Sequence, residues 1–510
     1  MRSAPRSAPL LAALLSFGLV LPFLGKPVHV DDANFLALAQ GARLDAWRPH
    51  AVPINWQGHL QPAFEVLSNP PGIGWLLAPV ADAPVWAQHL SLLPWLALAL
   101  WGAWRLGREL AGDGLGAVLV LGSSPVLVLA AQALTPDLPL AACVLGGLGG
   151  FVGLPRRWSW AFALLLGCAA LFRYSGLALI PLIVLAGWQR GRLWDSLTSL
   201  VPISALVLHD LHAYGEVHLL AMGSFQSVSN TPRELLRKAI ASVAMLGGAG
   251  LLPLAVGRRG IWGALAGAAL GVAGVLLSGQ SGLPALMTVA CAASGGASLG
   301  LLRARTPQDR LLLAWGLGGL LFLLALRFSA TRYWLPFLAA PALAILRQRP
   351  SRRLLGAMVG AQALLALLLS VDDLKLAQAQ QAAALWVGPG PGSVAGHWGW
   401  QHHMEAQGWT PLEDDGVPLA RLAVAEAPWP QEPDPSVCLT LERSAEFPDR
   451  WPGPRTHGAL AGANLHAFLV HADPLVETYA PWGFSDEPYE RVAVYARCGG
   501  ADPGPGSDSP

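Results

Sequence analysis

The stretch VWAQHLSLLPWLALALWGAWRLGRELAGDGLGAVLVLGSSPVLVLAAQALTPD, residues 85–137, contains the pattern that decides the fold. Its two apolar runs, 85–104 and 113–133, have about the length that a helix needs to cross a bilayer. A short turn that carries Arg105 and Arg108 separates them. Apolar runs that alternate with short turns predict an α-helical polytopic membrane protein.

The composition also favours a membrane environment. Of the 510 residues, 53% are hydrophobic and 13% are charged, and the mean hydropathy is +0.45. Soluble domains usually carry about 25% charged residues. The chain has 21 tryptophans, a residue type that is enriched where side chains meet lipid headgroups. The net charge of +1 provides no basic field for nucleic acid, so we expect no nucleic-acid partner.

Similar apolar runs occur along most of the chain. The first, from about Pro9 to Gly25, follows Arg2 and Arg6 and lacks a clean small-residue cleavage site. We therefore expect an uncleaved helix there rather than a signal peptide, and about 13 transmembrane helices in total. The remaining spans are expected at about 138–154, 159–172, 175–189, 197–213, 238–257, 261–278, 282–302, 311–328, 334–346 and 354–371.

Basic residues predict the orientation of these helices, because arginine and lysine favour the cytoplasmic side. If the N-terminus is inside, every second turn should be basic, and each of these turns contains arginine. They carry Arg105, Arg108, Arg156, Arg157, Arg190, Arg192, Arg258, Arg259, Arg303, Arg305, Arg310, Arg347, Arg349, Arg352 and Arg353. Two loops, 26–84 and 214–237, are then expected outside the cytoplasm of a plasma or inner membrane.

The same count divides the chain into three parts. We expect a transmembrane domain over 1–371, an extracytoplasmic C-terminal domain over 372–499, and a disordered tail over 500–510. The C-terminal domain should be small and of α/β or mixed type. Its strand-like stretches are Ser436–Leu441, Ala467–Val470 and Arg491–Tyr495.

The five cysteines fall into two groups. Cys143, Cys168 and Cys291 lie in apolar runs and are expected to be inert. Cys438 and Cys498 lie in the polar C-terminal segment, and outside the cytoplasm they can form a disulfide.

Acidic residues occur at the start of the first outer loop. In VHVDDANFLALAQG, residues 28–41, Asp31 occupies the N-cap position and Gly41 the C-cap position of an interfacial helix. Adjacent helical residues point about 100° apart, so Asp31 and Asp32 cannot both face one pocket. One would face the reaction and the other a partner. The simpler alternative is that both only cap the helix.

The same loop ends with SNPPGIGWLLAP, residues 68–79. Its prolines can begin a short helix, and Gly72 and Gly74 then permit the close approach of a backbone or a ligand. A helix start without further function is the alternative.

Two later outer turns carry one charge each. In LTPDLPL, residues 134–140, Asp137 lies at the outer end of a span, where an acid is costly unless it is paired or hydrated. In LFRYSGL, residues 171–177, Arg173 lies at the next outer turn. The alternatives are an ordinary N-cap for Asp137 and an arginine that extends to the membrane surface.

The turn RFSATRYWLP, residues 327–336, places Arg327 and Arg332 outside, against the usual preference of positive charge. An anionic ligand would explain both arginines, as would a salt bridge to one of the outer aspartates.

A histidine-rich segment follows the last predicted span. GHWGWQHHMEAQGW, residues 396–409, contains three histidines and Glu405, but their spacing matches no strong zinc pattern. We expect a helix that presents aromatic and polar groups to the catalytic face, and no cofactor; a divalent metal is the less favoured alternative. The chain has no GxxxxGK phosphate loop and no DxD triplet, which disfavours a nucleotide donor on the inside.

Taken in order, these motifs resemble those of the GT-C glycosyltransferases, in particular the aminoarabinose transferases of lipid A and the family 39 protein O-mannosyltransferases. The resemblance covers about residues 10–410. It rests on DDANF (31–35), NPPGIGWLL (69–77), TPDLPL (135–140), FRYSGL (172–177), ATRYWLP (330–336) and HWGWQ (397–401). It implies a multi-spanning enzyme of the cell envelope that takes sugar from a polyprenyl-phosphate carrier on the outer face.

The resemblance also implies roles for individual residues. The family usually has Asp-Glu where this chain has Asp31 and Asp32, which makes Asp31 the base and Asp32 its neighbour. No residue in the first outer loop clearly matches the phosphate-binding lysine of the family. We expect Asp137 to position the acceptor or to act as a second acid. Three arginines are expected to bind the donor phosphate, in the order Arg332, Arg173, Arg327.

The expected partners are a polyprenyl-phosphate-linked sugar, membrane lipids, and an acceptor hydroxyl on a lipid, glycan or protein. The sequence assigns neither the sugar nor the acceptor. A transporter or flippase of a polyprenol-linked sugar or lipid is the alternative function, although charged or broken helices at mid-membrane would then be expected. A non-catalytic membrane scaffold is a third possibility.

Overall fold

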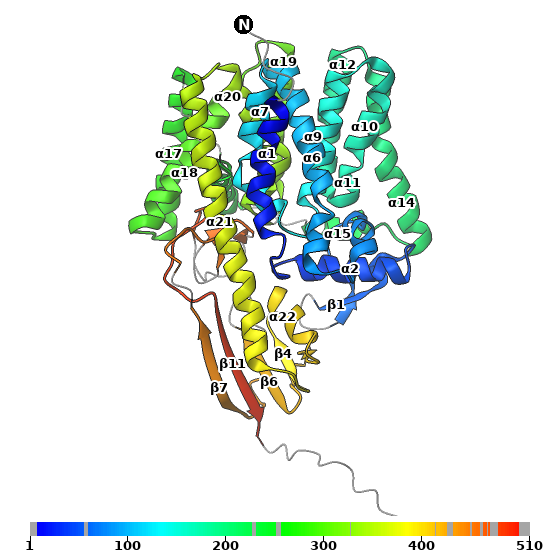
Figure 1. The fold of residues 1–510 in the computed structure, drawn as a ribbon, viewed down its shortest axis with the longest axis vertical. Coiled ribbons are helices and arrows are strands. Elements are labelled where there is room, and N and C mark those ends of the chain that lie inside the picture. Colours follow the sequence, from blue (N-terminus) through cyan, green and yellow to red (C-terminus); the bar gives the residue numbers. More distant parts are fainter. Residues whose placement is uncertain are drawn as a thin grey trace, which may run out of the picture.

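The computed structural model describes residues 8–55, 60–226, 231–250, 257–326, 328–413, 415–425, 432–448, 451–458, 463–466, 468–469 and 478–498. Arg327 and the predicted disordered tail, 500–510, lie outside the described residues. The described part forms a bundle of helices with a β-sheet at one end, and the N-terminus lies at the opposite end of the bundle (Figure 1).

Long apolar helices make up much of the bundle. Their outer surface carries many exposed apolar side chains, such as Leu276, which is 78% exposed, and Leu321, which is 66% exposed. Such a surface requires lipid as its solvent, so the protein is an integral membrane protein. Among the residues that the structure describes, five helical stretches are long and apolar enough to span a membrane: Val85–Ala111, Arg258–Ser278 (α17), Gly282–Gly300 (α18), Pro307–Ala325 (α19) and Arg352–Val387 (α21).

Several other predicted spans consist of shorter pieces, so the count of about 13 spans is not confirmed. The predicted span 113–133 is made of α7 (Gly114–Gly122) and α8 (Pro125–Ala130). The helix is interrupted before Pro125, because proline has no backbone N–H to continue the hydrogen bonds of α7. The stretch Val85–Ala111 contains α6 (Leu93–Leu106). Other helices of the bundle are α1 (Ala8–Val20), α9 (Asp137–Gly153), α10 (Ser159–Gly167), α12 (Ile180–Gln189), α14 (Val201–Ala213), α16 (Pro232–Gly248) and α20 (Ala339–Arg347).

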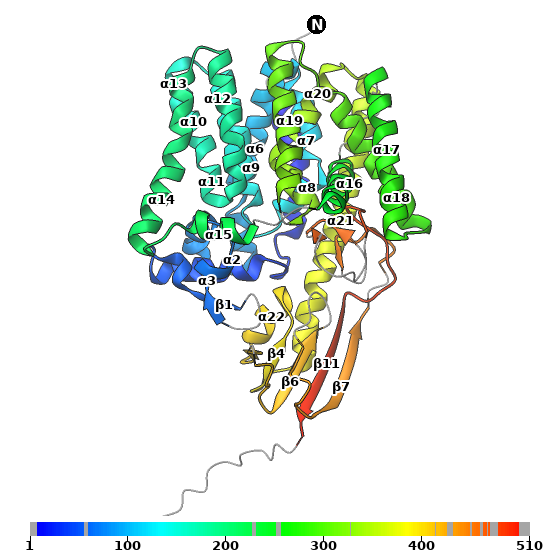
Figure 2. The ribbon, with the colours of Figure 1, turned by 180° about the vertical axis from the view of Figure 1, so that it is seen from behind.

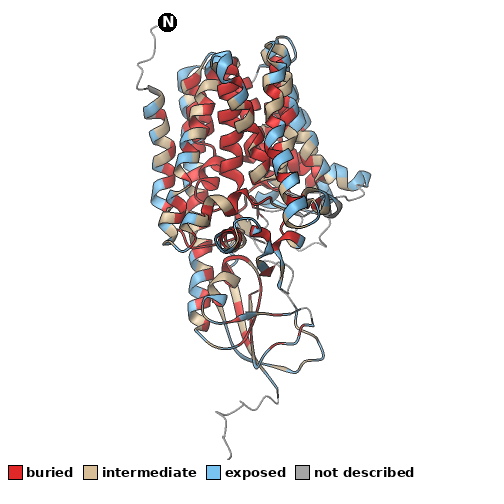
Figure 3. Ribbon diagram, turned by 90° about the vertical axis from the view of Figure 1, so that its right-hand side faces the viewer, coloured by how far each residue is buried: buried red, intermediate tan, exposed pale blue. Residues whose placement is uncertain are grey.

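The centre of the bundle is tightly packed, and its inner helices are buried along most of their length (Figure 3). Helix α9 packs against α6 through glycines. A Cβ atom added to Gly102 would lie 2.3 Å from the carbonyl carbon of Leu145, and one added to Gly149 would lie 2.7 Å from the carbonyl oxygen of Gly102. Small residues thus allow these two backbones to approach closely, as is common between membrane helices.

Two helices lie across the end of the bundle that faces the sheet, α2 (Asp32–Leu44) and α15 (His218–Gln226) (Figures 1 and 2). The prediction that Gly41 ends α2 is wrong, because the helix continues to Leu44. Gly41 serves packing instead, since an added Cβ would lie 2.5 Å from the carbonyl oxygen of Pro49. The side chain of Asp31 makes no capping hydrogen bond.

The segment 68–79 forms the predicted short helix, α4 (Gly72–Leu77), directly after Pro71. The predicted close approach at both glycines is confirmed. An added Cβ would lie 2.3 Å from the carbonyl oxygen of Leu171 at Gly72, and 2.7 Å from Cγ of Leu38 at Gly74.

The predicted domain boundary at 371–372 falls inside α21, which continues as one helix to Val387. The helix does not stop there because Ala383, Ala384 and Val387 are buried against the sheet and against Trp400. The transmembrane part and the sheet are therefore joined by a continuous helix rather than by a loop (Figure 1).

The sheet is mixed, with strand order β5-β4-β6-β11-β7. Strand β4 is parallel to β5 and β6, whereas β11 is antiparallel to β6 and β7. The strands are β4 (Ser393–Ala395), β5 (Thr410–Pro411), β6 (Arg421–Ala425), β7 (Leu439–Phe447) and β11 (Glu490–Arg497).

Of the three predicted strands, Arg491–Tyr495 is confirmed within β11. The stretch Ser436–Leu441 is only partly correct, because β7 begins at Leu439. Of Ala467–Val470, the described residues form β10 (Phe468–Leu469), which pairs with β3 (Phe328–Ser329) beside the bundle rather than with the sheet.

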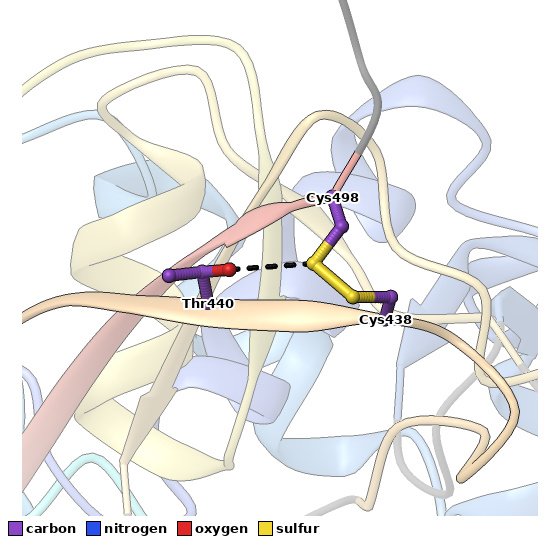
Figure 4. The surroundings of a disulfide bond; sticks show 3 residues. All are labelled: Cys438, Thr440 and Cys498. Atoms are coloured by element: carbon purple, nitrogen blue, oxygen red, sulfur yellow. Dashed lines mark hydrogen bonds between the residues drawn. A yellow bond between two sulfur atoms is a disulfide. The ribbon is translucent and has the colours of Figure 1, made fainter.

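A disulfide joins Cys438 and Cys498 where β7 begins and β11 ends, and closes a segment of 60 residues (Figure 4). A cross-link of this kind restricts the unfolded chain and typically stabilises by about 2–4 kcal/mol. We expect Cys438→Ser to lower the free energy of unfolding of the sheet by about this amount, measured by denaturation in detergent. Maleimide labelling of the unreduced, denatured protein should find only Cys143, Cys168 and Cys291; labelling of all five would contradict the pairing.

Candidate functional site

Two neighbouring cavities lie where α2 crosses the end of the bundle. The first, here called the polar cavity, has a volume of about 840 Å³ and is lined by charged and polar residues that include Asp31, Arg332 and Gln401. The second, here called the apolar cavity, has a volume of about 410 Å³ and is lined largely by aliphatic and aromatic side chains. Both cavities are lined by Ser68, Asn69, Arg173 and Tyr333.

Alternating acids and arginines connect the two cavities. Arg332 comes from the 3-10 helix Thr331–Phe337, and its Nη2 lies 2.5 Å from Oδ2 of Asp31. Its Nη1 lies 3.6 Å from Oδ2 of Asp137, whose Oδ1 lies 2.5 Å from Nη1 of Arg173. The structure thus brings together Asp31, Asp137, Arg173 and Arg332, and their formal charges cancel.

Tyr333 lies beside this chain of ion pairs, with the guanidinium of Arg173 4.2 Å from the centre of its ring. A cation over an aromatic face is attracted by the ring quadrupole. Arg173 is thereby held at the boundary between the polar and the apolar cavity.

Asp32 lies behind Asp31 and does not line the polar cavity. It is fully buried, its Oδ2 lies 3.0 Å from Nδ1 of His29, and its Oδ1 accepts a 2.8 Å hydrogen bond from the backbone N–H of Leu134. Burial alone would raise the pKa of the Asp32 carboxyl, but His29 and Lys26 hold that pKa below its usual value. Of the two adjacent acids, one therefore faces the cavity and the other fixes the surrounding structure.

A buried ionic network, which the sequence analysis missed, lies beside Asp32. The carboxylate of Asp373, in α21, lies 2.5 Å from Nζ of Lys26, 3.0 Å from Nε2 of His29 and 2.8 Å from Nε2 of His466. The available signal was a pair of acids, Asp372 and Asp373, directly after the last predicted span, where unpaired charge would be costly.

His29, Asp373 and His466 place one potential ligand atom each within 4.8 Å of one another, which is a spacing suited to a metal. However, both ring nitrogens of His29 lie 3.0 Å from a carboxylate oxygen. Burial alone would lower the pKa of His29, but Asp373 and Asp32 raise that pKa above its usual value. With a carboxylate oxygen at each of its ring nitrogens, and with the ammonium of Lys26 on the same carboxylate of Asp373, His29 belongs to an ionic network rather than to a metal centre.

The three histidines of segment 396–409 do not converge on one point. His397, at the N-cap of α22 (Trp398–Glu405), and His402, within this helix, line the polar cavity. The helix also contributes Trp398, Gln401 and Glu405 to the lining. His403 instead lies with its Nε2 3.2 Å from the carbonyl oxygen of Val28. Among the described residues, these three histidines do not form a group with metal-ligand spacing.

The backbone of the polar cavity is strained at two points. Val30, with φ of 47°, and Trp398, with φ of 67°, both adopt the left-handed region that side chains rarely occupy. Both line the polar cavity, and they pack in one cluster with Leu376 and Tyr489. Such strain costs about 1–3 kcal/mol per residue and tends to occur at functional sites. The shared packing of Val30 and Trp398 places the backbone before Asp31 beside the start of α22.

No protein-family model and no curated protein matches this chain. It is similar to the crystal structure of ArnT from Cupriavidus metallidurans in the apo state, with 15% identity and a TM-score of 0.43. It is also similar to ArnT from the same organism bound to undecaprenyl phosphate, with 16% identity and a TM-score of 0.42. Each comparison covers 79% of this chain and 84% of the other.

ArnT is a lipid A aminoarabinose transferase with the GT-C fold, so both neighbours come from the group that the sequence resembles. Both TM-scores are below 0.5, so neither likeness carries an argument about the activity of this chain.

Proposed function

We propose that this protein is a membrane glycosyltransferase that moves a sugar from a polyprenyl-phosphate donor to an acceptor hydroxyl on the outer face of the membrane. The single observation that carries this proposal is the junction of the polar and the apolar cavity at Arg173 and Tyr333. A ligand with an apolar chain and a polar head fits such a pair of cavities. Its chain would lie among Leu219, Met222 and Phe322, and its head beside the ion pairs.

Arginine suits the phosphate of this head, because a guanidinium presents several N–H donors in a fixed plane. The Nε of Arg332 is buried and has no hydrogen-bond partner among the residues that the structure describes. One donor is therefore available without breaking the ion pair to Asp31. Arg173, at the junction, is the second candidate.

Asp31 is suited to accept the proton of the attacking hydroxyl. Its Oδ2 is held by Arg332, whereas its Oδ1 has no hydrogen-bond partner in the described part of the chain. In the proposed step the acceptor oxygen bonds to the anomeric carbon as the bond from that carbon to the phosphate oxygen breaks. The hydroxyl proton passes to Asp31, and the polyprenyl phosphate leaves with its negative charge beside the arginines. Direct displacement inverts the anomeric centre.

The position of the cavities supports a site at the outer face. The N-terminus and the connections beside α12 and α20 lie at one end of the bundle, whereas α2, α15 and the sheet lie at the other (Figures 1 and 2). The basic turns predicted inside include Arg190 and Arg347, which follow α12 and end α20. With these turns in the cytoplasm, both cavities open outside, where a lipid-linked donor and an envelope acceptor can meet.

Replacing Arg332 tests the phosphate site. We expect Arg332→Gln to raise the KM for a polyprenyl-phosphate sugar by roughly 10- to 100-fold, because one charge-assisted bond to phosphate is lost. Arg332→Lys should recover part of the loss. The assay measures transfer of a radiolabelled sugar by purified protein in liposomes.

Arg421→Gln is the matched control, because Arg421 lies on the sheet and pairs with Glu442 at 2.9 Å. It should behave as wild type. Unchanged donor dependence in Arg332→Gln would place the phosphate elsewhere. Movement of the lipid-linked sugar between leaflets without a new glycosidic bond would favour the transporter.

A further inference from the structure

His466 lines the polar cavity and carries one ring nitrogen that has no hydrogen-bond partner among the described residues. Its side chain is buried, with a residue exposure of 5%, and it lines the cavity together with Asp31 and Arg332. Its Nε2 lies 2.8 Å from Oδ1 of Asp373, whereas its Nδ1 is buried without a hydrogen-bond partner among the described residues. Buried polar atoms are usually paired, so an unpaired nitrogen at a cavity wall points to a ligand.

The pairing with Asp373 determines which ring nitrogen carries the hydrogen. Asp373 is held ionised by Lys26 and His29, so its carboxylate accepts a hydrogen bond from Nε2–H of His466. In a neutral imidazole the other nitrogen is then an acceptor. Burial lowers the pKa of His466 despite the charge of Asp373, which keeps the ring neutral. Nδ1 therefore requires a donor, and a phosphate oxygen, which only accepts, cannot serve.

The fold places this acceptor directly beside the proposed phosphate site. The hydroxyl of Thr331 donates a 2.8 Å hydrogen bond to the carbonyl oxygen of Asn464. The backbone N–H of Arg332 donates a 3.3 Å hydrogen bond to the carbonyl oxygen of Leu465. The side chain of Asn464 donates in turn to the carbonyl oxygens of Thr478 and Ala480. His466 is thus fixed beside Arg332 by the C-terminal segment.

From this geometry we infer that His466 binds a hydroxyl group of the transferred sugar through Nδ1, and that Asp373 positions the ring for this purpose. The inference rests on the proposed function, because the sugar is bonded to the phosphate that Arg332 would hold. A hydroxyl can donate to Nδ1, whereas the phosphate cannot. The C-terminal segment then takes part in recognition of the donor sugar, and donors without a hydroxyl at that position are rejected.

Two substitutions separate this role from a purely structural one. His466→Gln places an amide near the position of Nε2, which keeps a donor for Asp373 and removes the acceptor at Nδ1. His466→Asn places an amide oxygen near the position of Nδ1 and loses the bond to Asp373. The probes are undecaprenyl phosphate and undecaprenyl phosphates that carry a hexose or a pentose, with affinities measured in detergent by tryptophan fluorescence.

We expect wild type to bind at least one sugar-bearing lipid about tenfold more tightly than undecaprenyl phosphate, as one additional hydrogen bond allows. His466→Gln should lose this difference and bind undecaprenyl phosphate as wild type does. His466→Asn should retain most of the difference. In folded wild type, the ¹⁵N resonance of His466 Nδ1 should shift with the sugar-bearing lipid and not with undecaprenyl phosphate.

Each other outcome overturns the inference. If His466→Gln retains the preference, or if the Nδ1 resonance does not respond, His466 does not bind the sugar, and the proposed function still stands. If both variants lose affinity for undecaprenyl phosphate as well, the role of His466 is structural. If wild type binds none of these lipids, the proposed function itself fails.

Discussion

Replacing Asp31 by asparagine is expected to reduce the rate of sugar transfer by about 10²–10⁴-fold, the usual contribution of a general base. Asparagine keeps the size of the side chain but cannot take a proton from the acceptor hydroxyl. Binding of undecaprenyl phosphate should persist, because Arg332 loses the charge of residue 31 but keeps its ion pair with Asp137. The effect should therefore appear in kcat far more than in donor affinity.

Transfer of radiolabelled sugar in liposomes measures this prediction. Asp82→Asn is the matched control, since Asp82 also pairs with an arginine, Arg43, but its side chain is 64% exposed. Wild-type turnover in Asp31→Asn would remove Asp31 as the base. Asp31→Glu should retain partial activity, because the carboxylate remains but its position changes.

The sequence predicted the components of this site better than their arrangement. Helical geometry correctly predicted that Asp31 and Asp32 do not face one pocket. The unusual position of Arg332 correctly indicated a salt bridge to one of the outer aspartates. Which acid Arg332 contacts was not predictable, because Asp31 lies 301 residues away along the chain. That pairing depends on how α2 crosses the end of the bundle.

The contribution of α21 and of His466 was missed for a different physical reason. The predicted span ended at 371 because Asp372 and Asp373 are charged, and a helix in lipid does not tolerate unpaired charge. In the structure the helix continues, since Lys26, His29 and the C-terminal segment supply partners for both acids. Hydropathy along a single helix contains no information about such partners.

The largest expected effect on stability comes from Lys26→Met. Lys26 and Asp373 are both fully buried, and Nζ lies 2.5 Å from Oδ2. Removing one partner of a buried ion pair typically costs about 3–5 kcal/mol, and here the carboxylate of Asp373 keeps only the imidazoles of His29 and His466 beside it. We expect a lower midpoint of thermal unfolding in detergent, followed by tryptophan fluorescence.

The control is Arg491→Met, which breaks ion pairs with Glu446 and Glu487 at the protein surface and should cost at most about 1 kcal/mol. If both variants unfold at the same temperature as wild type, the buried network does not support the fold. Lys26→Met should also weaken the discrimination between sugar-bearing and sugar-free lipids, because Asp373 positions the ring of His466. If Lys26→Met lowers the stability but leaves the discrimination between the lipids unchanged, the buried network stabilises the fold and does not position His466 for the sugar.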